Sequence, residues 1–428
     1  MIRDSVDGAN RAAIERALFE NRYDEGYLFP AYHDYCFANV SPTALSALGV
    51  DVSRTLPDDA LGQAPDTADN VLLVVLDGLR YDRWLNSIDR ISLFDRIDEH
   101  GSLVPLTSTY PSETAAAITT LHTGRQPVEH GVLGWEQYLP SSGLQVEPLP
   151  GRIVDGPTLD TATTEFDPTE LLDVRTVYDH LSEAGVESTV VHPYAISGSP
   201  FDELVTAGAR RSNYDTVAEL AVEARIALER PGHSYVVAYL PQIDTLSHHR
   251  GTKTDHYAPT VTMLASAIER ELERIDPDVA AETLVLITAD HGHLDTEPGV
   301  GLDLERFLGP LTDALLCVDG NRRRPTGGAR NVHLWVEDDR VDEVRDGIRT
   351  DGDARAWTRG ESVAIGLFGD DEPSTRFEER CGDVVFTHLE QCVWDDQRRF
   401  SHVGVHGGLH PDEMLVPFAA VELSTLLS

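Results

Sequence analysis

Several acidic and imidazole side chains stand immediately after apolar runs of the sequence. Asp77 follows Val71–Leu76, and both Asp290 and His291 follow Thr283–Thr288 closely. Apolar runs of this kind are typical of strands that are buried on both faces of a parallel sheet. Because the carboxyl ends of such strands line the binding crevice of a doubly wound sheet, we expect the three side chains to meet there.

A second group of polar residues follows the apolar run Ser234–Leu240. Asp244 and His248 are four positions apart, which places both on one side of a helical turn, where they can bind one cation. His406 precedes two glycines, which allow close approach of the backbone. A turn, a surface ion pair or a loop would explain each segment alone. Together they supply two sets of oxygen and nitrogen ligands that suit Zn²⁺, with Mn²⁺ as the alternative.

A threonine stands where an alanine-rich helix is predicted to begin. Thr114 occupies the expected N-cap position, and Gly124 is a typical residue for the end of that helix. A capping role alone would account for the threonine. The same position also suits a hydroxyl that contacts a phosphate, because free N–H groups and the positive end of the helix dipole lie beside it.

The order of the predicted elements indicates how these residues are positioned. Strand-like runs, including Ser188–His192, alternate with segments of helical periodicity near Ser87–His100, Glu170–Ala184, Thr216–Leu228 and Pro259–Ile275. This alternation predicts an α/β fold with a doubly wound, mostly parallel sheet and helices on both faces. We divide the chain into an N-terminal extension (1–67) packed on the core, a core (68–295 and 401–428) and an inserted α+β subdomain (296–400).

The charge of the chain limits its partners. Lys and Arg number 34 against 73 Asp and Glu, giving a net charge of −39, and Lys253 is the only lysine. Acidic residues spread along the whole chain predict a halophilic protein, because concentrated salt screens their repulsion. The negative electrostatic field of the chain repels phosphate backbones and anionic lipids, which argues against coating of nucleic acid or binding to a membrane surface. Four scattered cysteines and the absence of a long apolar run predict a soluble, cytoplasmic protein without a disulfide scaffold.

The motifs resemble those of the alkaline phosphatase superfamily, specifically its type I phosphodiesterase/nucleotide pyrophosphatase branch. The resemblance covers roughly residues 70–300 and 400–420. From Thr114 the branch's spacing continues to Thr123-Gly124, Pro127 and His130-Gly131. The segments Asp244-xxx-His248-xx-Gly251, Asp290-His291-Gly292 and His406–Pro417 follow in the family's order.

This resemblance implies an alkaline-phosphatase-like fold and a hydrolase with two divalent ions. One ion would be surrounded by Asp77, Thr114, Asp290 and His291, and the other by Asp244, His248 and His406. Thr114 would attack phosphorus and form a phospho-threonine, while the second ion would stabilise the leaving oxygen and then activate water. The partner would be a small phosphorylated substrate, with a nucleotide among the candidates.

The sequence departs from the branch at one position. Phosphodiesterases of this branch carry an asparagine that contacts a phosphoryl oxygen, and Trp135 stands there in this chain. Arg80 or His249 would be the replacement contact, with a solvated side chain as the alternative for each. Thr109, in a Thr-Tyr-Pro sequence, is a rival nucleophile that its distance from Gly124 disfavours.

Several alternatives stay open at this point. The flanking histidines His293, His402 and His410 are expected to support the ligands or to lie at the surface. Because no clear cation beyond Arg80 would neutralise a monoester, a diester or pyrophosphate substrate is favoured over a phosphomonoesterase or a phosphonoacetate-hydrolase-like C–P hydrolase. A non-catalytic binding module of the same fold is the alternative from another class. No Cys-x-Pro-x-Arg, G-x-S-x-G or P-loop sequence occurs, which excludes those hydrolase classes.

Overall fold

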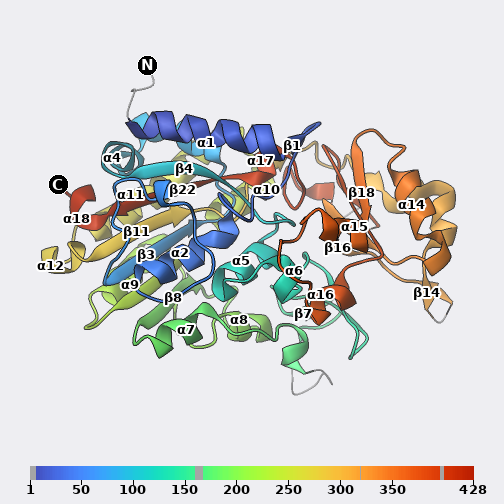
Figure 1. The fold of residues 1–428 in the computed structure, drawn as a ribbon, viewed down its shortest axis with the longest axis horizontal. Helices are drawn as coiled ribbons and strands as arrows, with labels where there is room; N and C mark the ends of the chain where they lie inside the picture. Colours follow the sequence, from blue (N-terminus) through green and yellow to red (C-terminus); the bar gives the residue numbers. More distant parts are fainter. Residues whose placement is uncertain (1–5, 160–166, 319, 396–399) are drawn as a thin grey trace.

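The centre of the molecule is a seven-stranded sheet in the order β4-β22-β11-β3-β10-β8-β9 (Figure 1). The computed structural model describes residues 6–159, 167–318, 320–395 and 400–428. The strands are β3 (Asn70–Leu76), β4 (Ser102–Thr107), β8 (Glu187–Pro193), β9 (Arg210–Tyr214), β10 (Ser234–Leu240), β11 (Thr283–Thr288) and β22 (Leu415–Glu422). All run in one direction except β22, which pairs antiparallel with both β11 and β4. The prediction of a doubly wound, mostly parallel sheet is confirmed.

The four apolar runs predicted as strands form β3, β8, β10 and β11, which occupy inner positions of the sheet. Every residue of β3, β10 and β11 is buried, because elements cover both faces of the sheet. The two edge strands were not predicted. Pro105 interrupts the apolar pattern of β4, and β9 is mostly polar; both features are tolerated at a sheet edge.

Two groups of helices pack against this sheet. One consists of α4 (Ser92–His100), α9 (Val217–Leu228) and α11 (Tyr257–Leu272), and the other of α2 (Val40–Ala47), α5 (Thr114–Thr123) and α7 (Val177–Glu183). The predicted helices near 87–100 and 170–184 begin later than expected, since short 3₁₀ turns precede α4 and α7. No helix in the described ranges is both long and apolar enough to cross a membrane.

The polypeptide between β11 and β22 builds a second, smaller sheet beside the first (Figure 1). Its order is β16-β17-β19-β18, with bounds Thr326–Gly328, Asn331–Leu334, Val384–His388 and Ala354–Thr358. Helix α14 (Val341–Ile348) packs on β18 and β19 over an apolar cluster that includes Val344 and Phe386. The division into extension, core and insert stays a prediction, and residues 1–5, 160–166, 319 and 396–399 lie outside the described residues.

Candidate two-metal active site

The predicted ligands gather at the carboxyl end of three neighbouring strands. Asp77 follows β3, Asp290 follows β11, and Asp244 lies in α10 (Gln242–Arg250), directly after β10. Because β3 lies between β10 and β11 in the sheet, the three carboxylates meet although they are far apart in sequence. Backbone contacts join the segments, with the Asp244 N–H donating to the Asp77 carbonyl at 3.0 Å.

The first cluster contains Asp77, Asp290 and His291, whose ligand atoms all lie within 4.8 Å of one another. His291 Nε2 is 3.4 Å from Asp77 Oδ1 and 3.5 Å from Asp290 Oδ2. The Thr114 hydroxyl lies 3.0 Å from the same His291 nitrogen. All four side chains are buried, so the structure brings the four residues of the first predicted set together in one enclosed space.

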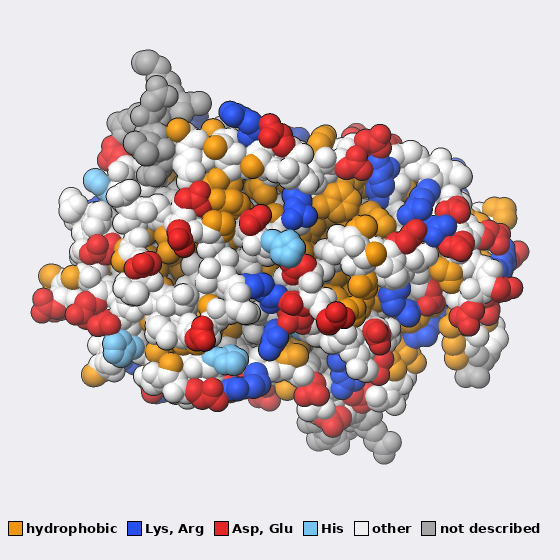
Figure 2. Space-filling model, viewed as in Figure 1, with side chains coloured by type: hydrophobic (Ala, Val, Ile, Leu, Met, Phe, Trp, Pro, Cys, Tyr) orange, Lys and Arg blue, Asp and Glu red, His pale blue; other side chains and the backbone are white. Residues whose placement is uncertain are grey.

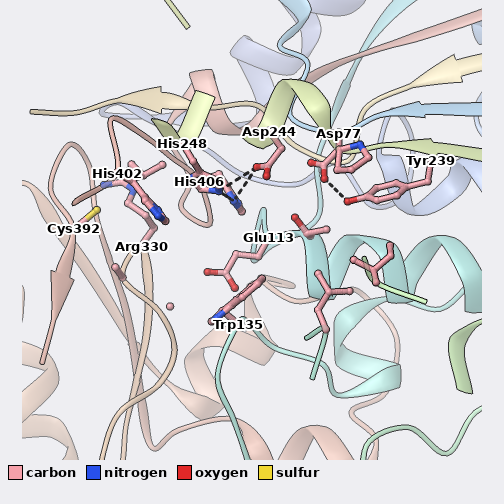
Figure 3. Close-up of a pocket in the computed structure, with 17 residues that line it drawn as sticks. Asp77, Glu113, Trp135, Tyr239, Asp244, His248, Arg330, Cys392, His402 and His406 are labelled. Carbon is pink, nitrogen blue, oxygen red and sulfur yellow. Dashed lines mark hydrogen bonds and ion pairs between the residues drawn. The ribbon is translucent and has the colours of Figure 1, made fainter. Parts of the chain in front are cut away.

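The second cluster contains Asp244, His248 and His406 (Figure 3). Asp244 Oδ1 lies 3.2 Å from His248 Nε2 and 3.6 Å from His406 Nε2. The first two share one face of helix α10, as their spacing predicted. The rings of His406 and His291 stack with centroids 3.7 Å apart, so the two clusters are adjacent.

The chemistry of the donors in both clusters fits divalent cations. Within the described residues, Asp77 Oδ1 and Asp290 Oδ2 are buried without a hydrogen-bond partner. Burial and then the nearby carboxylates of Asp290 and Asp244 raise the pKa of Asp77 well above its usual value. Burial and the neighbouring imidazoles hold the pKa of His406 well below its usual value, which keeps the ring neutral. Crowded carboxylates beside imidazoles are the oxygen and nitrogen ligands that Zn²⁺ and related ions take.

The start of helix α5 differs from the prediction. Glu113, with φ −123° and ψ 141°, occupies the N-cap, and Thr114 is the first helical residue. The N-cap assignment of Thr114 was therefore wrong. Since no side-chain capping bond forms at this helix, the Thr114 hydroxyl is directed to His291 instead of to the backbone. The helix ends at Gly124 in the left-handed conformation, φ 65°, as expected.

A cavity of about 310 Å³ opens onto both clusters. Its walls include Thr114, Glu113 and Trp135, together with the apolar side chains Leu149 and Ile196. In Figure 3, Trp135 and Glu113 lie across this space from Asp244 and His406. The indole Nε1 of Trp135 is buried and has no hydrogen-bond partner among the described residues. Trp135 therefore lines the cavity that both clusters face, and its contact with a substrate stays a prediction.

Arg80 does not line this cavity. Its two terminal nitrogens bind the Asp412 carboxylate at 2.6 and 2.7 Å, and its Nε donates to Asp82. One terminal nitrogen also donates to the His293 carbonyl at 3.2 Å. The donors of Arg80 are therefore engaged by Asp412, Asp82 and the His293 carbonyl, and a contact between Arg80 and substrate stays a prediction. His249 is exposed and lies outside the cavity as well.

Three residues at the site were missed or underrated from sequence. The Tyr239 hydroxyl donates to Asp77 Oδ2, and only its place near the end of an apolar strand could have indicated this. His293 is fully buried, with Nε2 3.0 Å from Asp244 Oδ1, and it lies two positions after the proposed ligand His291. His402 lines the cavity, and its ring centroid is 4.4 Å from that of His248.

The remaining candidates take structural positions. Thr109 is buried, lies outside the cavity lining and donates to the carbonyl of Pro111. His410 caps α17 (Pro411–Met414) by accepting a hydrogen bond from the Asp412 N–H. Neither contact requires a reacting group, and both side chains support the loops that carry the clusters.

Comparison with known proteins agrees with this geometry. A family model described as type I phosphodiesterase/nucleotide pyrophosphatase matches residues 71–408. Murine ectonucleotide pyrophosphatase/phosphodiesterase 5, solved as an inactive form in complex with AMP, gives a TM-score of 0.61 at 15% identity, covering 83% of this chain and 92% of that one. The human protein gives a TM-score of 0.60 at 15% identity, covering 83% of this chain and 92% of that one.

Phosphonoacetate hydrolase from Sinorhizobium meliloti, in complex with phosphonoformate, gives a TM-score of 0.57 at 18% identity, covering 83% of this chain and 94% of that one. At these identities the solved structures establish a shared fold. No curated protein matches the chain.

Proposed function

Because the chain belongs to the type I phosphodiesterase/nucleotide pyrophosphatase family of the alkaline phosphatase superfamily, we propose that it hydrolyses phosphodiester or pyrophosphate bonds through a phospho-threonine on Thr114. The observation that carries this proposal is the position of the Thr114 hydroxyl, 3.0 Å from His291 Nε2 within the first cluster. A hydroxyl among buried metal ligands at the start of a helix is placed to become a nucleophile.

Two divalent ions, Zn²⁺ or alternatively Mn²⁺, would be held by the two clusters. One set is Asp77, Thr114, Asp290 and His291, and the other is Asp244, His248 and His406. When bound, the ions supply positive charge that lowers the pKa of the attacking hydroxyl and of water and stabilises the leaving oxygen.

The protein's own groups would then act in two displacements. Thr114 Oγ1 forms a bond to phosphorus as the bond to the leaving oxygen breaks. Water afterwards displaces the threonine oxygen, which releases the phosphate product and regenerates the hydroxyl. The free N–H groups of the first turn of α5 support the phosphoryl oxygens. His406 stacks on His291, and its Nε2 lies 3.2 Å from His248 Nε2, so the second set of proposed ligands is adjacent to the first.

The charges around the cavity favour a diester over a monoester. Among the described residues that line it, Arg330 is the only arginine or lysine. Its guanidinium is already engaged by Glu413 and by two backbone carbonyls. The additional negative charge of a monoester therefore has no free cationic side chain to meet it. A C–P bond is the second candidate, since phosphonoacetate hydrolase shares the fold.

The test compares hydrolysis of bis-p-nitrophenyl phosphate with that of p-nitrophenyl phosphate in concentrated KCl with Zn²⁺ or Mn²⁺. We expect cleavage of the diester, its loss on chelation of the metal and its recovery when metal is restored. Thr114→Ala should abolish turnover, whereas Thr109→Ala, which removes another buried threonine hydroxyl nearby, should retain it.

Other results would redirect the assignment. Preference for the monoester would make the protein a phosphatase, and full activity of Thr114→Ala would remove the threonine intermediate. If the folded protein binds two ions but hydrolyses neither ester, a phosphonate substrate would be favoured. A folded chain that holds no ion would favour a binding module.

A further inference from the structure

A buried ion pair joins the insert to the turn that carries His406. Arg330 Nε donates to Glu413 Oε1 at 3.0 Å, and Nη2 donates to Oε2 at 2.6 Å. The two residues are 1% and 0% exposed. Two of the three remaining guanidinium hydrogens bond the carbonyls of Leu389 and Gln391, each at 2.8 Å. All nitrogens of Arg330 are therefore committed to fixing one carboxylate and one loop of the insert.

The same carboxylate holds the turn on its other side. Glu413 Oε1 accepts from the Gly408 N–H at 2.9 Å, and Oε2 accepts from the His410 N–H at 3.3 Å. Across the turn, the Ser112 hydroxyl donates to the Gly408 carbonyl, and His406 Nδ1 lies 3.0 Å from the Ser112 carbonyl. These contacts leave His406 Nε2 directed toward the second cluster, 3.2 Å from His248 Nε2.

Stability alone is a weak reason for such a pair. Burial acts to raise the pKa of Glu413, but the Arg330 charge and its hydrogen bonds outweigh burial and lower that pKa. Both groups therefore stay charged although their side chains are buried. Because desolvation offsets most of the attraction in a buried pair, the distinctive consequence of this pair is geometric. The pair fixes one orientation of the Glu413 carboxylate, and the N–H groups of the 406–410 turn bond to the carboxylate in that orientation.

We propose that Arg330 is a positioning residue that acts through Glu413 to hold His406 against Asp244 and His248, so that the insert sets the affinity of the second metal cluster. This inference rests on the proposed function, because it requires His406 to be a metal ligand. It also gives the insert a role in metal binding, since Arg330 lies in the turn between β16 and β17.

The test is a zinc titration of the apoprotein against a chromophoric chelator, which resolves the two binding steps. Glu413→Gln leaves one acceptor oxygen for two N–H donors of the turn, and Arg330→Met removes the fork that orients the carboxylate. We expect one step to weaken about 10–100-fold, as for other residues that orient ligands, and the other step to stay unchanged. A general loss of stability would affect both zinc-binding steps, so weaker binding in one step alone indicates a local effect.

Two further variants keep the test decisive. Each single change leaves a buried charge without its partner and is expected to destabilise the fold. The double variant Arg330→Met/Glu413→Gln has no charge at either buried position. It should therefore be more stable than either single variant and still show the weakened zinc-binding step. Arg11→Met breaks the partly buried ion pair between Arg11 of α1 (Val6–Arg22) and Asp98 of α4, and it should lower stability without moving either step.

His406→Ala separates the possible failures. If this variant weakens one step but the double variant does not, the positioning role of Arg330 is overturned and the ligand assignment stands. If His406→Ala leaves both steps unchanged, the ligand assignment fails, and the inference fails with it. Equal weakening of both steps in the double variant would also overturn the role proposed for Arg330.

Discussion

The two oxygens of Asp77 face different partners. Oδ2 accepts a hydrogen bond from the buried Tyr239 hydroxyl, while Oδ1 lies 3.4 Å from His291 Nε2. Tyr239 also lines the cavity, so one side chain both contacts a proposed ligand and forms part of the cavity wall. Groups that orient ligands in this way commonly tune metal affinity as strongly as some ligands do.

Removal of this hydroxyl should therefore weaken metal binding. We expect Tyr239→Phe to lower zinc affinity at the Asp77 cluster about 10-fold or more, measured by chelator competition. Tyr235→Phe is the matched control, because Tyr235 is buried near the opposite end of the same strand and its hydroxyl interacts with Ser41, not with a proposed ligand. Equal affinities in the two variants would contradict an orienting role for Tyr239.

Asp290 should affect the apoprotein and the metal-bound protein in opposite directions. Its carboxylate is one of the causes, after burial, that raise the pKa of Asp77. Asp290→Asn removes this repulsion, so the metal-free protein should unfold at a higher temperature than the wild type. The same change should abolish one ion site and reduce diester hydrolysis by orders of magnitude. Unchanged turnover would refute the assignment of Asp290 as a ligand.

At the scale of elements, close packing between β11 and α17 shapes the first cluster. The Gly292 N–H donates to the Glu413 carbonyl at 2.8 Å, and a Cβ at Gly292 would lie 2.2 Å from the Asp412 carbonyl oxygen. The turn that carries Asp290 and His291 can approach α17 only because this position has no side chain.

Gly292→Ala should consequently displace the ligand turn. We expect loss of about 1–3 kcal/mol of unfolding free energy, as for other overpacked sites, together with weaker zinc binding at the first cluster. Urea unfolding and zinc titration measure the two effects. Gly352→Ala is the control, since a Cβ there meets no atom within 4 Å. Wild-type zinc affinity in Gly292→Ala would show that the turn tolerates the shift.

At the scale of the whole molecule, surface charge governs the conditions under which the fold is stable. Acidic side chains are scattered over the visible face, with arginines between them (Figure 2). Many arginines are paired, as in Arg225 with Glu229 and Glu271. Even with every Lys and Arg paired, the 73 acidic side chains exceed the 34 basic ones by 39, so a net charge of −39 remains. We propose that the protein is halophilic, because only concentrated salt screens that repulsion.

The midpoint of thermal unfolding should therefore rise as KCl increases from about 0.1 to 1 M, over which the Debye length falls from about 10 to 3 Å. Differential scanning calorimetry of the metal-free protein measures this directly. Sucrose at equal osmolarity is the control, because it strengthens burial without screening charge. A midpoint that responds equally to both additives would argue against charge repulsion as the cause.

Buried histidines predict how stability depends on pH. Burial lowers the pKa of His333 to about 3, below the value of about 6.5 expected when unfolded. Between these values the unfolded chain binds one more proton, so this residue makes stability fall as the pH decreases. His333→Asn should make the slope of unfolding free energy less steep by about 1.4 kcal/mol per pH unit between about pH 4 and 6.

Urea titrations at several pH values measure that slope. His100→Asn, at an exposed histidine, is the control and should leave the slope unchanged. Identical slopes for His333→Asn and the wild type would mean that His333 takes up its proton without unfolding.

Sequence patterns were sufficient for four of the five inner strands and for the grouping of most candidate ligands. Uninterrupted apolar runs identify strands that are covered on both faces, and polar residues at their ends must lie at one edge of a parallel sheet. Asp77, Asp290 and His291 could therefore be placed together without knowledge of the strand order. The spacing of Asp244 and His248 is a property of one helical turn, which is local as well.

Other features depended on contacts between segments that are distant in sequence. Arg80, adjacent to the Asp77 turn in sequence, faces Asp412 instead of the cavity. The edge strands β4 and β9 form by pairing with partners whose hydrogen bonds compensate for a weak local pattern. The Arg330–Glu413 pair joins two segments that neither composition nor periodicity relates. Periodicity along the chain reports which side chains are buried, but the direction of a side chain is decided by the groups that the folded chain brings against it.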